Sequence, residues 1–193
     1  NLGDKNVECI NVEDKRVVVI GGGDTAMDCV RTSVREGAQT VKCLYRRDEV
    51  NMPGSKKEVV NAKEEGVEFV FNVSPKSIKV KDNSAFAVEL LETSMSEPDG
   101  SGRQKVVVNQ GSEYLEEADV VILALGFSPE APTFLKELNV ETNSWGAVVV
   151  NSEFKTSNKK VYAGGDCQRG AHLAVTAAAD GREAAKAIVK DLL

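Results

Sequence analysis

The feature that most constrains the fold of this chain is a glycine-rich turn between an apolar run and a helical pattern. Residues 17–20 are all apolar and β-branched, which is typical of a parallel strand covered on both faces. Gly21, Gly23 and Ala26 then follow the spacing G-x-G-x-x-G/A of dinucleotide-binding folds. The alternative is a strand-to-helix turn that binds nothing, and the strand before it and helix after it favour the nucleotide site.

Each position of this turn has a physical role in holding a dinucleotide. Gly21 permits the tight turn, Gly23 lets a pyrophosphate approach the backbone, and Ala26 lets the helix pack closely on the strand. The helix is expected over residues 24–36, and its first N–H groups point at the pyrophosphate. The pattern therefore predicts a pyrophosphate site at the start of this helix.

A second strand is expected at residues 41–46, and the residues at its end indicate which dinucleotide is preferred. An acidic residue about 20 positions beyond the glycines favours NAD, whereas an arginine favours NADP. Here Arg46 and Arg47 stand at the strand end, and their planar guanidinium groups suit a 2′-phosphate. Asp48 and Glu49 follow, so the alternative is that the arginines pair with these carboxylates at the surface.

The middle of the chain changes from alternating strands and helices to short strands. A helix is expected over residues 56–66, with Ser55 and Glu58 as a capping box, followed by a strand at 67–71. Strands of an antiparallel β-meander are expected at residues 76–80, 85–93 and 103–109, with a mobile loop at 96–102. A buried parallel strand is expected at 118–127, with Gly126 near the edge where open α/β sheets bind ligands.

The last third of the chain repeats the strand-and-glycine pattern. We expect a helix at residues 133–138, strands at 147–150 and 161–167, and an Ala-rich helix at 171–193. The predicted fold class is α/β, a Rossmann-like parallel sheet with an attached β-meander. The expected division is a linker at 1–14, a nucleotide-binding domain at 15–126 and a further segment at 127–193 with its own strand-to-glycine turn.

Composition excludes several classes of function. The 193 residues carry a net charge of −6, which argues against non-specific nucleic-acid binding, and no apolar run reaches membrane-spanning length. The four cysteines are Cys9, Cys29, Cys43 and Cys167, which are scattered without a CxxC. This spacing excludes a compact zinc or iron–sulfur cluster and a local redox dithiol within the chain, and it predicts reduced thiols in a cytoplasmic protein.

Taken together, several motifs resemble one family. They are Gly-Gly-Gly-Asp-Thr-Ala-Met-Asp-Cys, Tyr-Arg-Arg, Met-Pro-Gly, Glu-Glu-Gly-Val-Glu-Phe, Ala-Leu-Gly-Phe and Ala-Gly-Gly-Asp…Arg-Gly-Ala, in this order. The chain resembles the small-subunit family of NADPH-dependent glutamate synthases, within a flavoprotein superfamily that includes part of dihydropyrimidine dehydrogenase and NADP-linked ferredoxin reductases. The resemblance covers nearly the whole chain.

The resemblance implies an NADPH domain inserted into an FAD domain, with hydride passing from NADPH to FAD. Residues 15–126 would then be the NADPH-binding domain, and residues 127–193 the C-terminal segment of the FAD-binding dinucleotide domain. Electrons then leave through iron–sulfur clusters toward the large glutamate synthase subunit or another iron–sulfur acceptor. It implies the following cofactor-binding residues: Gly21, Gly22, Gly23, Asp24 and Thr25 for the pyrophosphate, Arg46 and Arg47 for the 2′-phosphate, Gly126 near the nicotinamide, and Gly165, Asp166, Ala171, His172 and Leu173 for FAD. It implies no metal ligands in this chain.

The chain departs from the family pattern in two ways. It lacks the cysteine-rich iron–sulfur domain and the first FAD glycine fingerprint, so we expect a C-terminal part of a longer subunit that binds FAD poorly alone and self-associates through its last helix. His172 stands where the family pattern has Ser, and we interpret it as a neutral pocket residue rather than a general acid. Asp166 could serve either the flavin or simply its helix N-terminus.

The sequence leaves three functions to be compared. The first is the NADPH:flavin reductase unit of a glutamate synthase-like subunit or a related iron–sulfur flavoprotein. The second is a nucleotide-binding module that binds NADPH without turnover. The third, a thioredoxin-reductase-like disulfide enzyme, is disfavoured because the chain has no CxxC. Hydride transfer needs positioned cofactors rather than an acid–base pair, and the sequence indicates no catalytic residue of its own.

Overall fold

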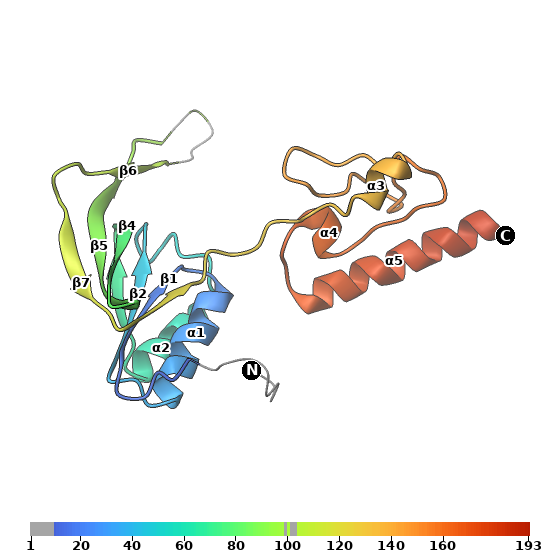
Figure 1. Ribbon diagram of the computed structural model, residues 1–193. Coiled ribbons are helices and arrows are strands. Elements are labelled where there is room, and N and C mark those ends of the chain that lie inside the picture. The colour runs from blue at the N-terminus through green and yellow to red at the C-terminus, as the bar shows by residue number, and fades with distance from the viewer. Residues whose placement is uncertain (1–9, 99, 101–103) are drawn as a thin grey trace. The chain divides into compact units, whose positions relative to one another are not determined.

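A computed structural model describes residues 10–98, 100 and 104–193 of the chain (Figure 1). The chain divides into two compact units, Asn1–Leu125 and Gly126–Leu193. Cys9, most of the expected linker and part of the loop expected to be mobile lie outside the described residues.

The first unit is built on a parallel sheet with the strand order β3-β2-β1-β8. The strands are β1 Arg16–Ile20, β2 Thr40–Tyr45, β3 Glu68–Phe71 and β8 Val120–Leu123. All three pairings are parallel, as predicted. The expected strand at 118–127 is shorter than predicted because it pairs only as far as Leu123, which lies opposite the last residue of β1, Ile20.

Helices α1 (Asp24–Arg35) and α2 (Lys56–Glu64) cover one face of this sheet. Val17 and Val19 of β1 point to this face, where they pack in one core cluster with Met27 and Val30 of α1 and with residues of α2. Ala26 is fully buried in the same cluster, so the helix lies close to the sheet at this point. The third small residue of the glycine motif therefore packs as its spacing predicts.

An antiparallel sheet covers the opposite face, and its strands are β4 Val73–Lys81, β5 Ser84–Met95, β6 Val106–Val108 and β7 Tyr114–Glu117. Figure 1 shows this sheet on the side of β1 and β2 away from α1 and α2. Val18 and Ile20 of β1 pack there against Val88 and Leu90 of β5. The meander is confirmed, and its strand β7, which pairs with β5, was missed by the sequence analysis.

The start of β1 is held to the start of β8 by Arg16. Its backbone N–H and its Nε each donate to Asp119 Oδ2 at 2.9 Å, and its Nη2 donates to Asp119 Oδ1 at 2.7 Å. These bonds, with the Arg16 charge, hold the pKa of Asp119 well below its usual range. The pair sets the register in which Ile20 lies opposite Leu123.

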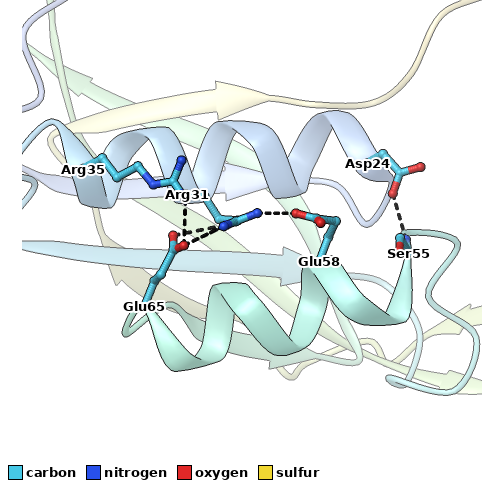
Figure 2. Close-up of polar contacts among 6 residues, drawn as sticks. All are labelled: Asp24, Arg31, Arg35, Ser55, Glu58 and Glu65. Atoms are coloured by element: carbon cyan, nitrogen blue, oxygen red, sulfur yellow. Dashed lines mark hydrogen bonds and ion pairs between the residues drawn. The ribbon is translucent and has the colours of Figure 1, made fainter. Parts of the chain in front are cut away.

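Ion pairs join α1 to α2 along their contact, as Figure 2 shows. Arg31 of α1 pairs with Glu58 and donates from Nη2 to Glu65 Oε1 at 2.6 Å, and Arg35 reaches the same oxygen at 2.8 Å. The predicted capping box is wrong: Ser55 makes no side-chain cap bond, and Glu58 binds Arg31. A tertiary partner has replaced the local one because Arg31 offers a full positive charge.

The second unit contains little regular structure before its last helix. Its helices are α3 Phe134–Glu137, α4 Asp166–Arg169 and α5 Ala174–Leu192, and a small core is formed by Leu135, Val140 and Val148. The expected strands at 147–150 and 161–167 are reduced to the single bridges Thr142–Val148 and Lys155–Tyr162. Neither segment has a full neighbouring strand within the described part of this unit.

The helix expected from residue 171 begins three residues later, at Ala174. Gly170 has φ +86°, and Leu173 is extended, with φ −66° and ψ 140°. Residues 170–173 therefore form a connection rather than a first helical turn. No helix in the described part of the chain has the length and apolar character needed to cross a membrane.

We expect Arg31→Met to lower the melting temperature of the chain at pH 7 by about 3 °C, because α1 and α2 lose their central ion pairs. Arg31, and then Arg35, lower the pKa of Glu65 from its usual 4.5 to about 2. A lowered folded-state pKa contributes stability above pH 4.5 that is lost as the pH falls toward 2. Circular dichroism melts from pH 7 to pH 2 should show the difference between wild type and variant shrinking over that window.

Arg182→Met is the matched control, because Arg182 is an exposed arginine of α5 whose carboxylate partner, Glu183, is its own neighbour. It makes the same change in net charge away from the α1–α2 contact. A pH-independent difference for Arg31→Met, or an equal loss for both variants, would contradict this account of the ion pairs.

Candidate functional site

The glycine turn lies at the carboxyl end of the central strand, where the order of the sheet reverses. From β1 the chain moves to β2 and β3 on one side, and later to β8 on the other. Open α/β sheets bind ligands outside the carboxyl ends of the strands at such a point. Gly21 follows β1 directly, and α1 begins at Asp24.

The three glycines of the turn have different surroundings. A Cβ on Gly21 would lie 2.2 Å from the Ala124 carbonyl oxygen, and Gly21 also has φ +154°. A Cβ on Gly22 would lie 2.5 Å from two ring carbons of Tyr45. A Cβ on Gly23 would meet no atom of the described residues within 4 Å. Packing thus accounts for the first two glycines, while the third faces open space, as expected of the position that a pyrophosphate approaches.

Asp24 and Thr25, the next two predicted site residues, form the exposed first turn of α1. No side chain caps this helix, and its Ncap residue is Gly23. The first N–H groups of a helix lack intrahelical partners and carry its positive end, so they suit an anion. The Asp24 carboxylate, in contrast, accepts a hydrogen bond of 2.7 Å from the backbone N–H of Ser55.

The segment before α2, to which the sequence analysis gave no role in the site, lies against this turn. The N–H of Gly54 donates to the Gly22 carbonyl oxygen at 2.9 Å. A Cβ on Gly54 would lie 3.0 Å from that oxygen and 3.4 Å from the carbonyl carbon of Gly23. The signal in the sequence was the glycine in Met-Pro-Gly-Ser, directly before α2, where no helix end requires one.

Arg46 and Arg47 directly follow β2, and neither forms an ion pair with a described residue. Asp48 instead accepts hydrogen bonds from the backbone and side-chain nitrogens of Asn51, at 2.9 and 2.8 Å. Glu49 pairs with Lys63 at 2.6 Å. Among the described residues, therefore, the two carboxylates that follow the arginines do not pair with them.

The backbone that carries these arginines is fixed from the meander. Thr93 Oγ1 donates to the Arg46 carbonyl oxygen at 3.0 Å, and the Asn72 N–H donates to the Arg47 carbonyl oxygen at 3.2 Å. The Arg47 Nε is buried and has no hydrogen-bond partner among the described residues. A buried donor of this kind is costly without an acceptor, so it is consistent with an anionic ligand.

The second unit contains the other predicted site residues in and after its own glycine turn. Gly165 has φ +75°, and its N–H donates to Asp180 Oδ2 at 2.9 Å. Asp180 is buried on α5 and also accepts from Arg169 Nε at 2.7 Å, and this pairing lowers the pKa of Asp180. Asp166, the first residue of α4, is exposed and free of this network.

The remaining predicted residues precede α5 or begin the second unit. Ala171, His172 and Leu173 are exposed, and His172 Nδ1 lies 3.0 Å from the Thr176 hydroxyl oxygen. Gly126 has φ +86°, and a Cβ there would meet no described residue of the second unit within 4 Å. Asp166 and Ala171 line an open cavity of about 510 Å³ within the second unit, together with apolar residues such as Phe127, Phe134 and Val148.

The structure therefore brings Gly21, Gly22, Gly23, Asp24 and Thr25 together at one turn, with Arg46 and Arg47 on the segment that returns to that turn. The three described cysteines are free thiols, and burial raises the pKa of Cys43 to about 12. The described residues contain no group of three His, Cys, Asp or Glu side chains placed to hold a metal ion.

Comparison with known proteins shows the family of the chain. Residues 2–181 match the family model described as pyridine nucleotide-disulphide oxidoreductase. The chain is 52% identical over 185 residues to "Glutamate synthase [NADPH] small chain" of Escherichia coli (strain K12), covering 93% of this chain and 39% of that one. It is 49% identical over 185 residues to "Putative oxidoreductase AegA" of the same organism, covering 93% of this chain and 28% of that one.

Among solved structures, "Mycobacterium tuberculosis FprA in complex with NADPH" has a TM-score of 0.75 at 18% identity, covering 94% of this chain and 53% of that one. This likeness supports the fold. The similarity to glutamate synthase small chains confirms the resemblance drawn from the motifs. The chain spans about two fifths of the length of the Escherichia coli small chain.

Substitution of two glycines should separate packing from ligand access. We expect Gly21→Ala to lower the free energy of unfolding by about 3 kcal/mol, through backbone strain and overlap with the Ala124 carbonyl group. Gly23→Ala should change it by less than about 0.5 kcal/mol, because its Cβ meets open space and its φ is −91°. Urea unfolding followed by circular dichroism measures both, and equal losses would show that packing also requires Gly23.

Proposed function

The chain belongs to the pyridine nucleotide-disulphide oxidoreductase family, and from that premise we propose that it is the NADPH-binding domain, with part of the FAD-binding domain, of an NADPH-dependent flavoprotein oxidoreductase. More specifically, it is the electron-input part of a glutamate synthase-like small subunit. The similarity to small chains over 93% of this chain supports the specific assignment.

One observation carries the NADPH assignment: the turn with open space at Gly23 and the cationic end of β2 belong to one connected site. Gly23 leaves room for a pyrophosphate beside the unpaired N–H groups of α1. Arg46 and Arg47 provide guanidinium groups that described carboxylates do not occupy, and the Arg47 Nε lacks an acceptor. NADPH has both of the anionic groups that these features would accept.

In this proposal the residues of the chain bind and orient the nucleotide. Gly21, Gly22, Gly23, Asp24 and Thr25 form the turn that receives the pyrophosphate, and the positive end of α1 stabilises its charge. The arginines accept the 2′-phosphate through charge-assisted hydrogen bonds. The bound cofactors supply the redox chemistry, a hydride transfer from NADPH to FAD.

The second unit supplies part of the proposed FAD site. Gly165 and Asp166 form the turn that faces the flavin nucleotide, and Asp180 with Arg169 holds this turn in place. Ala171, His172 and Leu173 follow it, and Gly126 belongs to the nicotinamide end. Iron–sulfur clusters in other parts of the protein would take the electrons onward, and the large glutamate synthase subunit would be the partner that receives them.

Two alternatives remain to be tested. The first is the reductase unit of a different iron–sulfur flavoprotein, because the chain is also 49% identical to a putative oxidoreductase with another name. The second is an NADPH-binding module without turnover. Anaerobic mixing of the chain with FAD and NADPH tests turnover: loss of the flavin's visible absorbance that is faster than in the same mixture without the chain supports a reductase over the module.

The cofactor assignment makes a quantitative prediction. Arg46→Ala and Arg47→Ala should each weaken NADPH binding by about tenfold or more, because each charge-assisted contact contributes about 1.5–3 kcal/mol. NADH lacks the 2′-phosphate, so its affinity should change by less than about twofold. Titration calorimetry of both nucleotides against the wild type and each variant measures the two effects.

Lys81→Ala is the control for charge, because it removes one exposed cation from the hairpin between β4 and β5. It should leave the affinities for both nucleotides near those of the wild type. Equal losses of NADH and NADPH affinity in the arginine variants would show that the arginines support only the fold, and the NADPH assignment would fall.

A further inference from the structure

The segment from Arg46 to Ser55 is fastened at both ends to parts of the proposed nucleotide site. It begins with the two arginines and returns to the glycine turn, where Gly54 donates to Gly22 and Ser55 donates to Asp24. Midway, the Tyr45 hydroxyl donates to the Asn51 carbonyl oxygen at 2.8 Å, and the Tyr45 ring lies against Gly22. The segment and the turn thus form one bonded loop.

From this arrangement we propose that Asp24 is a positioning residue that sets the preference for NADPH over NADH, although the 2′-phosphate is recognised by other residues. The Asp24 carboxylate holds Ser55, and through it the segment that begins with Arg46 and Arg47. The inference rests on the proposed function, because it concerns how that site tells the two nucleotides apart.

The geometry of the ligand explains why such a link matters. The pyrophosphate and the 2′-phosphate of NADPH are attached to the same ribose, so the distance between them varies little. A site must therefore hold the pyrophosphate turn and the arginines at a fixed separation to engage both groups at once. Thr93 and Asn72 hold the carbonyl groups of the arginines. Two hydrogen bonds, from Gly54 to Gly22 and from Ser55 to Asp24, join the far end of the same segment to the turn.

The charge of Asp24 also favours this role over direct contact with the pyrophosphate. A carboxylate in the first turn of α1 complements the helix dipole, but it repels a bound pyrophosphate. Its hydrogen bond to the Ser55 N–H gives the carboxylate a partner on the protein. Asp24 therefore holds the neighbouring segment through Ser55. Direct contact of its carboxylate with the pyrophosphate would weaken nucleotide binding.

The contact between α1 and α2 reinforces the anchor. Figure 2 shows Asp24 and Ser55 joined at one end of the two helices, with Arg31, Glu58 and Glu65 paired further along. Ser55 precedes α2 directly, so the ion pairs of Arg31 hold the start of α2 beside α1. The arginine segment is thereby placed relative to the helix that receives the pyrophosphate.

The hydrogen bond can be deleted with one substitution, Ser55→Pro. Proline has no N–H, and Ser55 already has φ −54°, a value that the proline ring adopts. We expect the ratio of NADPH to NADH affinity, measured by titration calorimetry on the 193-residue chain, to fall by about fivefold. NADH affinity itself should change little, because the glycine turn remains.

Two control variants separate the loss of the Ser55 N–H from the loss of its side chain and from the general effect of adding a proline. Ser55→Ala removes the same hydroxyl and keeps the N–H, so it is the reference against which Ser55→Pro is compared. Lys56→Pro adds a proline at the first position of α2, where proline is well tolerated, and Ser55 has the ψ of 124° that a following proline requires. Lys56→Pro should keep the wild-type ratio.

Replacement of the acceptor gives an independent test. Asp24→Asn keeps an oxygen that can accept from the Ser55 N–H, so it should retain the nucleotide preference, whereas Asp24→Ala should reduce it as Ser55→Pro does. A merely structural role would weaken both nucleotides together and leave the ratio unchanged. An unchanged ratio in Ser55→Pro and Asp24→Ala overturns the inference alone, while a wild-type chain without preference for NADPH overturns both this inference and the proposed function.

Discussion

The first unit depends on the burial of β1 from both sides. Val17, Val18 and Val19 are at most 1% exposed, and alternate side chains enter two separate core clusters. Burying each such side chain contributes about 1.5–3 kcal/mol, and a shift of one residue would exchange the two faces. The pair of Arg16 and Asp119 fixes the register at the start of the strand. The position of the glycine turn at its far end follows directly.

That fixed strand end explains which parts of the turn serve packing and which remain for a ligand. Gly21 lies so close to Ala124 of the neighbouring chain segment that no side chain is possible, and Gly22 lies against Tyr45. Both constraints come from the strands on either side of β1. Gly23 has no such neighbour, so its small size is the one part of the motif that the protein's own packing does not explain. The proposed nucleotide site gives Gly23 a role, because a pyrophosphate would approach the backbone there.

Local patterns predicted the elements well wherever the local preference and the tertiary contacts agree. The central strands, α1 and the meander are examples, since apolar periodicity both forms and buries them. Prediction failed where a distant group competes: Glu58 binds Arg31 instead of capping its own helix. It missed β7, whose Tyr114–Glu117 sequence carries two glutamates in four residues. The contact of Gly54 with the turn was also not predicted, because it joins segments about 30 residues apart in the sequence.

At the proposed nucleotide site, the pairing of neighbouring charges matters more than the net charge of the chain. The chain has 30 acidic and 24 basic side chains, so its average field repels phosphates. Over distances beyond about 10 Å that average is screened by salt, and the nearest unpaired groups dominate. At the end of β2 the two acidic neighbours of the arginines are engaged by Asn51 and Lys63. These pairings leave the two guanidinium groups without a carboxylate partner among the described residues, so a chain of net negative charge keeps two arginines at the end of β2 for the proposed 2′-phosphate.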